Sequence, residues 1–208
     1  MEPTDENLRA FEDAHRPVER GETSLPPQVR QSLADLSGKR VLHIGAGSGA
    51  ATVEFVELGA SVTGVDPSEG ALERARERAP SVLWIHSELD TVPSELQRGR
   101  FDLAYAGVGT VQGVRDLDLF AGSVVATLRV GGDLLLYDEH PAALCVDGLM
   151  HWREDYFETG FHRLGQIVGA LARHDMAVRA LEEYPPGQGS FHDQRLPETF
   201  LLHARKVR

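Results

Sequence analysis

Apolar and polar positions follow one repeating pattern from Lys39 to about residue 140: a short continuous apolar run, then a longer amphipathic stretch. Continuous apolar runs are typical of strands that are buried on both faces of a parallel sheet. The longer stretches start beside glycine, proline, serine or aspartate and several end at glycine or proline, as helices do. The pattern predicts strands over residues 40–45, 61–66, 81–86, 101–106 and 133–138, and helices over 50–58, 67–79 and 116–129.

The repeat stops after residue 140. Residues 141–160 mix aromatic residues with acids, and Trp152, Tyr156 and Phe157 either cover an apolar substrate or form the underside of a lid. A helix is predicted over 164–173, followed by two strand-like runs, 177–184 and 199–207. With no helix between them, these two strands should pair antiparallel. The whole pattern predicts an α/β fold, a doubly wound sheet with one reversed strand near its edge.

The first part of the chain has a different character. Residues 1–25 are polar and are expected to form one short helix, Asn7–Arg16, and a second helix is expected from Pro26-Pro27 to Leu36 because proline is tolerated in a first turn. We therefore expect a helical cap over residues 1–36 and one domain over 37–208, with a lid or substrate insert at 141–163. A chain of 208 residues is short enough for a single core.

Composition narrows the classes of partner. The net charge is −11, from 32 acidic and 21 basic residues, which disfavours nucleic acid because binding it requires a basic surface. No window approaches ~18 uninterrupted apolar residues, and the acidic start does not resemble a secretory signal. Cys145 is the only cysteine, so an internal disulfide or a cluster of thiolates is excluded. We expect a cytoplasmic protein that binds neither nucleic acid nor membrane; an edge-to-edge homodimer is compatible with the sequence.

The segment VLHIGAGSGA places Gly45, Gly47 and Gly49 between a predicted strand and a predicted helix. Glycines at such a turn allow a sharp change of direction and let a ligand approach the main chain, where the first amides of the helix face it. The alternative is a tight turn without a ligand. The context of strand, glycines and helix favours a nucleotide-containing ligand.

Acidic residues follow the next two strands. Asp66 ends the second strand, where ligands of open α/β sheets bind, and its carboxylate can accept both hydroxyl protons of a ribose; alternatively it caps the next helix. Glu88 follows the third strand and can accept the amine of an adenine with the Leu89 amide nearby, or it is a surface residue. The string GAGSGA also satisfies the dinucleotide pattern, so NAD(P) fits too, although no Tyr-x-x-x-Lys pair supports hydride transfer.

The segments VLHIGAGSGAATVEFVELGASVTGVDPSEGALERARE and FDLAYAGVG…VRDLDLFAGSVVATLRVGGDLLLYDEHP resemble class I S-adenosylmethionine-dependent methyltransferases, in particular small bacterial members. The resemblance covers nearly everything after residue 37. It implies a Rossmann-like seven-stranded sheet of order 3-2-1-4-5-7-6 with the last strand antiparallel. The cofactor residues that it implies are Gly45, Ala46, Gly47 and Gly49 for the methionine part, Asp66 for the ribose with Pro67 and Ser68 beside it, Glu88 and Leu89 for the adenine, and Ala106 and Gly107 for the sulfonium side.

The sequence departs from that family at two positions. His43 stands where most members carry an acid, so the amino end of the methionine is expected to be held differently. Gly113 stands where relatives often carry a tryptophan, which indicates a roomier substrate pocket. The Pro-Pro-aromatic and Pro-Cys motifs of DNA methylases are missing from the sequence.

Methyl transfer from a sulfonium depends mainly on alignment and on exclusion of water. A base is also required when the acceptor loses a proton. His140 follows the fifth strand and is the first candidate, since the unperturbed pKa of histidine, ~6.5, suits a base; His162 is the second, and each is alternatively a structural histidine. Glu139 either orients His140 or is itself a base. Asp138 and Glu139 lack a matching third ligand, so we expect no metal.

The sequence therefore predicts an S-adenosylmethionine-dependent methyltransferase that transfers a methyl group to an O, N or C atom of a small molecule. Two alternatives stay open. One is an NAD(P)-dependent oxidoreductase with a Rossmann domain. The other is a non-catalytic module that binds S-adenosylmethionine.

Overall fold

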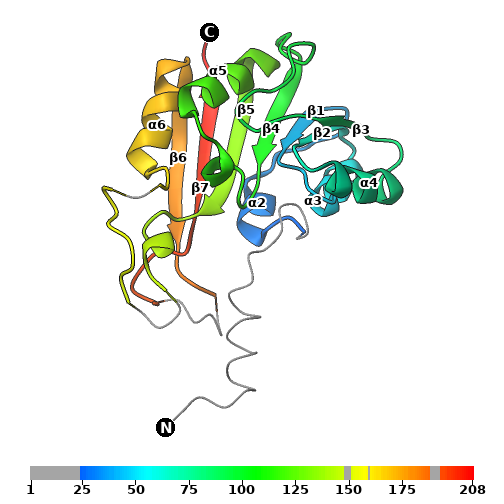
Figure 1. Cartoon of the computed structure of the whole chain (residues 1–208). Helices are drawn as coiled ribbons and strands as arrows, with labels where there is room; N and C mark the ends of the chain where they lie inside the picture. Colours follow the sequence, from blue (N-terminus) through cyan, green and yellow to red (C-terminus); the bar gives the residue numbers. More distant parts are fainter. Residues whose placement is uncertain (1–23, 148–150, 159, 188–192) are drawn as a thin grey trace, which may run out of the picture.

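The computed structural model describes residues 24–147, 151–158, 160–187 and 193–208. A seven-stranded sheet runs through them in the order β3-β2-β1-β4-β5-β7-β6 (Figure 1). The strands are β1 Arg40–Ile44, β2 Ser61–Asp66, β3 Leu83–His86, β4 Phe101–Ala106, β5 Leu128–Glu139, β6 Met176–Tyr184 and β7 Thr199–Lys206. The predicted strand order is confirmed.

The first five strands are parallel to one another, and β7 is antiparallel to both of its neighbours, β5 and β6. The predicted antiparallel pairing of the last two strands is therefore confirmed. As a consequence β6 ends, and β7 begins, at the edge of the sheet where β1 to β5 end. Residues from the last hairpin can reach the same edge as the residues that follow each parallel strand.

Helices cover both faces of the sheet (Figure 1). Three of them, α2 Pro27–Ser32, α3 Ala50–Glu57 and α4 Glu69–Arg78, contribute Val29, Phe55 and Leu72 to one core cluster. The other two, α5 Leu117–Thr127 and α6 Leu164–Arg173, pack Phe120 and Ile167 into a second cluster on the opposite face. Both layers bury apolar side chains of the strands, which explains why the strands read as continuous apolar runs.

Two boundaries differ from the sequence prediction. The helix expected to reach Leu36 ends at Ser32, because Leu33 turns to an extended conformation with φ −76° and ψ 130°. The following segment then carries Leu36 into the core, where it is 6% exposed. The predicted helix Asn7–Arg16 lies outside the described residues.

The fifth strand begins at Leu128 and not at Asp133. Gly131 and Gly132, which lie between the predicted helix 116–129 and the predicted strand 133–138, form an irregularity within the strand, where the pairing with β4 shifts register. Gly131 has φ +75°, and a Cβ on Gly132 would lie 2.9 Å from the Arg129 carbonyl oxygen. The two glycines therefore allow the strand to continue through a bulge that other residues would block.

The segment predicted as a lid, 141–163, leaves the sheet after β5. It contains a short 3-10 helix, η2 Ala143–Cys145, and an isolated antiparallel bridge between Val146 and Trp152. Two of its aromatic side chains are open to solvent, with Trp152 59% and Phe157 74% exposed, whereas Tyr156 and Phe161 are half-buried. Cys145 is buried. In the described part of the chain, no helix has the length and apolar character needed to cross a membrane.

The packing of Trp84 indicates one position in the sheet, Gly64, where a larger side chain should lower the stability of the protein. Its ring lies over β2, and a Cβ on Gly64 would overlap that ring, which is held by a bond from Nε1 to the Ala79 carbonyl oxygen at 3.0 Å. We expect Gly64→Ala to lower the free energy of unfolding by about 1–3 kcal/mol, as overpacking does. Denaturant unfolding measures this.

Gly70→Ala is the matched control, because nothing lies within 4 Å of the added Cβ and Gly70 is helical. This variant should be neutral, or more stable by up to about 1 kcal/mol. Equal stabilities of the two variants would contradict the packing assigned to Trp84.

Candidate functional site

Segments far apart in the sequence meet at one edge of the sheet. Because β1 to β5 are parallel, the residues that follow them lie along their common carboxyl edge. The helix after β1 and the helix after β4 cover opposite faces, so the connections diverge between these neighbouring strands. Ligands of open α/β sheets bind at such a switch point. The structure thus brings the predicted cofactor residues that follow β1, β2, β3 and β4 to one edge of the sheet.

The glycine loop after β1 has three residues with positive φ: Gly45 at 67°, Gly47 at 51° and Gly49 at 81°. A Cβ on Gly45 would overlap the hydroxyl of Thr110, and one on Gly49 would lie 2.8 Å from the Trp84 ring. The backbone conformation and these two close approaches therefore require glycine. Gly49 also precedes α3, so the loop leads directly into a helix N-terminus.

Asp66 links this loop to the end of β2. Its side chain is 1% exposed, its Oδ2 accepts a hydrogen bond from the Gly47 amide at 2.8 Å, and its Oδ1 accepts one from the Ser68 amide at 2.8 Å. The N-cap of α4 is Ser68, whose Oγ accepts from the Ala71 amide, so the alternative in which Asp66 caps the helix is wrong. A carboxylate has about four acceptor positions, and two remain besides these amides.

Glu88 follows β3 at the same edge. Its side chain is 64% exposed and lies 3.7 Å from the Arg115 guanidinium, an exposed ion pair that contributes little stability. The Leu89 side chain is buried in the core on the α5 side of the sheet. A carboxylate held only by this weak contact is accessible to a ligand amine.

His43 is enclosed by protein. Its ring is 1% exposed, Nδ1 lies 2.7 Å from Thr52 Oγ1, and the ring centroid lies 5.1 Å from that of Tyr105 and 5.9 Å from that of Phe55. Burial lowers the pKa of His43 to about 3, so the ring is neutral at physiological pH. The structure therefore places this predicted cofactor residue in the core between β1 and α3.

The loop after β4 starts with Ala106 and Gly107, both buried. It is held by Asp138, a residue that sequence analysis considered only as a metal ligand. The Asp138 carboxylate is fully buried and accepts hydrogen bonds from the amides of Gly109, Val111 and Glu139. Burial raises the pKa of Asp138 to about 7. The sequence contains one signal for this role of Asp138, namely an acidic residue at the last position of the buried apolar run DLLLYD.

His140 lies where β5 meets the last hairpin. Its ring is largely buried, Nδ1 accepts from the Ala142 amide at 3.1 Å, and Nε2 lies 2.8 Å from Glu183 Oε1 of β6. The contact with Glu183 has the distance of an ion pair but not the angles of a hydrogen bond. Burial lowers the pKa of His140, and Glu183 opposes that shift. Glu183 was not predicted as a site residue, because the local sequence pattern does not indicate which side chain at the carboxyl edge of the sheet it contacts.

His162 has different neighbours from His140. Its Nε2 lies 2.6 Å from the Val114 carbonyl oxygen, and its amide donates to Gln112 at 2.9 Å. It lines an open groove of about 650 Å³ that runs between the starts of α5 and α6 and the end of the insert, where Tyr156 and Phe157 form part of the wall. His140 and His162, the two candidate bases, therefore lie in different local environments. Among the residues that the structure describes, no three His, Cys, Asp or Glu side chains are grouped to hold a metal ion.

Comparison with known proteins gives a consistent set of matches. A family model described as a methyltransferase domain matches residues 41–132. The chain is 38% identical over 103 residues to a ubiquinone biosynthesis O-methyltransferase of Bradyrhizobium sp. (strain ORS 278), covering 49% of this chain and 40% of that protein. It is 33% identical over 135 residues to a ribosomal protein L11 methyltransferase of Geobacter sulfurreducens, covering 64% of this chain and 40% of that protein. The chain therefore spans about two fifths of these curated relatives.

A solved structure extends the similarity over most of the chain. The S-adenosylmethionine-dependent methyltransferase from Mesorhizobium loti superposes with a TM-score of 0.72 at 26% identity. The match covers 86% of this chain and 96% of that protein. The likeness thus extends well beyond the part of the chain that the family model covers.

The burial of His43 predicts how stability depends on pH. The unfolded chain binds a proton near pH 6.5, whereas the folded protein binds it only near pH 3. Stability should therefore be lost as pH falls from 6.5 toward 3, by up to about 1.4 kcal/mol per pH unit from this residue. In His43→Gln, which cannot bind the proton, the slope measured by denaturant unfolding should be shallower. Parallel slopes for the two proteins would contradict the assignment.

Proposed function

We propose that this chain is a class I S-adenosylmethionine-dependent methyltransferase, and that it transfers a methyl group from S-adenosylmethionine to an oxygen, nitrogen or carbon atom of a small molecule in the cytoplasm. The observation that carries the proposal is the contact between Asp66 and Gly47 at the switch point of the sheet. It fixes the glycine loop against the end of β2, with a buried carboxylate beside it.

The residues at this edge fit such a nucleoside. Asp66 has two acceptor positions left after binding its two amides, which matches the two hydroxyls of a ribose. Glu88, on the next strand, supplies an accessible acceptor for an amine such as that of adenine. The glycine loop leads into the N-terminus of α3, where main-chain amides can face a ligand.

S-adenosylmethionine, when bound, supplies an electrophilic methyl group. The residues of this chain have the task of alignment: Asp66 and Glu88 hold the nucleoside, and Ala106 and Gly107 flank the methyl side. Holding the two reactants in a near-attack geometry and excluding water provides most of the rate in such a displacement. The insert 141–163 is proposed to close over the acceptor.

A small molecule is proposed as the acceptor on two grounds. The chain is acidic, with a net charge of −11, which disfavours a nucleic acid. The open groove beside the insert has aromatic walls from Tyr156 and Phe157, which suit an organic molecule.

We further propose His140 as the proton acceptor when the acceptor atom must lose a proton. Glu183 beside Nε2 orients the ring and favours its protonated form, and Nδ1 takes the proton once its lone pair exchanges the Ala142 amide for the proton of the acceptor atom. A base oriented by a carboxylate is a recurring arrangement in enzymes. Glu139 and His162 are the alternatives for this role.

The cofactor assignment is tested by calorimetric titration with S-adenosylhomocysteine, the demethylated product. Asp66→Ala should weaken binding about tenfold or more, because charge-assisted hydrogen bonds to the ribose are lost. Asp102→Ala is the control: that carboxylate binds the Arg40 amide and Arg129 at the opposite edge of the sheet, so affinity should not change.

Wild-type protein that binds NADH and not S-adenosylhomocysteine would overturn the proposed cofactor. Equal affinity of Asp66→Ala and wild type would remove only the ribose role of Asp66.

The base is tested with an acceptor found by screening metabolites for the mass gain of one methylene group. His140→Gln should lower kcat about 100-fold or more while S-adenosylhomocysteine affinity stays unchanged. Glu183→Gln should move the acidic limb of the pH–kcat profile to lower pH, because Glu183 raises the pKa of His140. Unchanged kcat of His140→Gln across pH would leave the residue structural.

A further inference from the structure

The loop after β4 is fastened by one buried carboxylate. Asp138 Oδ1 accepts from the Gly109 amide at 2.6 Å, and Oδ2 accepts from the Val111 amide at 2.8 Å. A third amide, that of Glu139, also donates to Oδ1 at 2.8 Å. Each oxygen of the carboxylate therefore holds one end of the three-residue stretch from 109 to 111.

Thr110 stands between these two held amides and faces the glycine loop. Its side chain is fully buried, and its hydroxyl lies 3.4 Å from the Ile44 carbonyl oxygen. The space that a Cβ on Gly45 would need is filled by Thr110, whose methyl and Cβ atoms are each 3.2 Å from that position. Thr110 is thus seated directly against the first residue of the glycine loop.

We infer that Asp138 is a positioning residue: by binding the amides of Gly109 and Val111 it holds Thr110 against Gly45 and so sets the glycine loop relative to Gly107. The inference rests on the proposed function, because the two parts it aligns are those assigned to the methionine and methyl sides of the cofactor. Asp138 itself touches neither. Its effect on binding is transmitted through Thr110.

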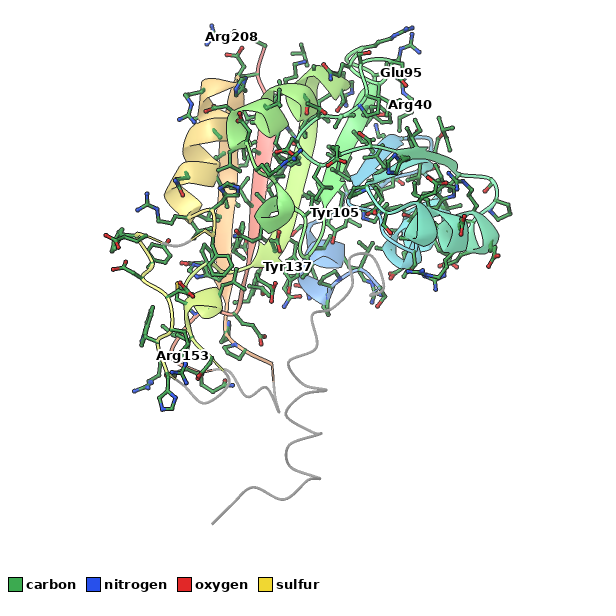
Figure 2. All side chains as sticks on the ribbon, viewed as in Figure 1. Arg40, Glu95, Tyr105, Tyr137, Arg153 and Arg208 are labelled. Atoms are coloured by element: carbon green, nitrogen blue, oxygen red, sulfur yellow. The ribbon has the colours of Figure 1, made fainter. Side chains whose placement is uncertain are left out.

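The energetics of Asp138 support a role beyond filling space. It follows Leu134 and Leu136 on the same face of β5, where an apolar side chain would be buried without cost. Burial raises the pKa of Asp138 to about 7, and the titratable groups that interact with it electrostatically are Glu139, Tyr105 and Tyr137. Tyr105 and Tyr137 come from the ends of β4 and β5, as Figure 2 shows. None of these groups is cationic, so the loop amides are what stabilises the charge.

The test compares Asp138→Asn with Asp133→Asn. The asparagine keeps the shape but presents an NH₂ group to an amide donor, so one end of the loop is released. Asp133 lies on the same strand, about 17 Å away toward the opposite edge, and is bound by Arg205 and His203. Both variants lose polar interactions of a carboxylate on β5, but only the first faces the loop.

Two readouts separate positioning from stability. Hydrogen exchange of residues 107–113 in the ligand-free protein should become faster in Asp138→Asn and stay unchanged in Asp133→Asn. Affinity for S-adenosylhomocysteine should fall about tenfold in the first and not in the second. Wild-type affinity should also decrease as pH falls below about 7, as Asp138 is protonated, and this decrease should be absent in Asp138→Asn.

Thr110→Ala keeps the inference testable if Asp138→Asn does not fold. It removes the contact with Gly45 while leaving the carboxylate and its amides in place, and it should weaken S-adenosylhomocysteine binding with little change in exchange at Gly109 and Val111. Wild-type affinity retained in both variants would overturn the inference. Wild-type protein that binds no S-adenosylhomocysteine would instead overturn the proposed function, which the wild-type titration reports independently.

Discussion

Backbone amides that emerge beyond the end of a parallel strand have no neighbouring strand to accept their hydrogen bonds, and they must find another acceptor. In this protein, aspartates at the same edge of the sheet meet that need. Asp66 binds the Gly47 and Ser68 amides, Asp138 binds those of Gly109 and Val111, and Asp90 binds those of Arg115 and Asp116. The shape of the edge depends on these three carboxylates, because each one fixes a connection that has no regular secondary structure.

The same carboxylates can stabilise a connection and take part in ligand binding. A carboxylate that holds two amides is fixed in place, and it retains acceptor positions besides those two. Asp66 is the clearest example, since the same side chain closes the glycine loop onto β2 and borders the proposed nucleoside site. The carboxyl edge of the sheet is therefore ordered before any ligand binds, which reduces the conformational entropy that is lost on binding.

The fold was predictable because it follows from apolar periodicity and chain order. The strands that begin at Arg40, Ser61 and Phe101 occur where continuous apolar runs predict them. The bulge at Gly131-Gly132 was not predictable, because a glycine pair is equally compatible with a turn. For the site, the glycine loop and Asp66 could be located from spacing alone, whereas the contact of His140 with Glu183 depends on the register of the last hairpin. Likewise, Asp138 gains its role from the direction of two amides in another loop, which no local pattern encodes.

The position of Trp84 has an optical consequence. This indole lies beneath the glycine loop, 2.8 Å from where a Cβ on Gly49 would stand, while the other tryptophan of the chain, Trp152, is exposed on the insert. One fluorophore thus emits from an apolar interior next to the proposed nucleoside site, and the other emits from water on a separate segment. The emission spectrum of the unlabelled protein should contain two resolvable components, one from Trp84 beside the glycine loop and the other from Trp152 on the insert.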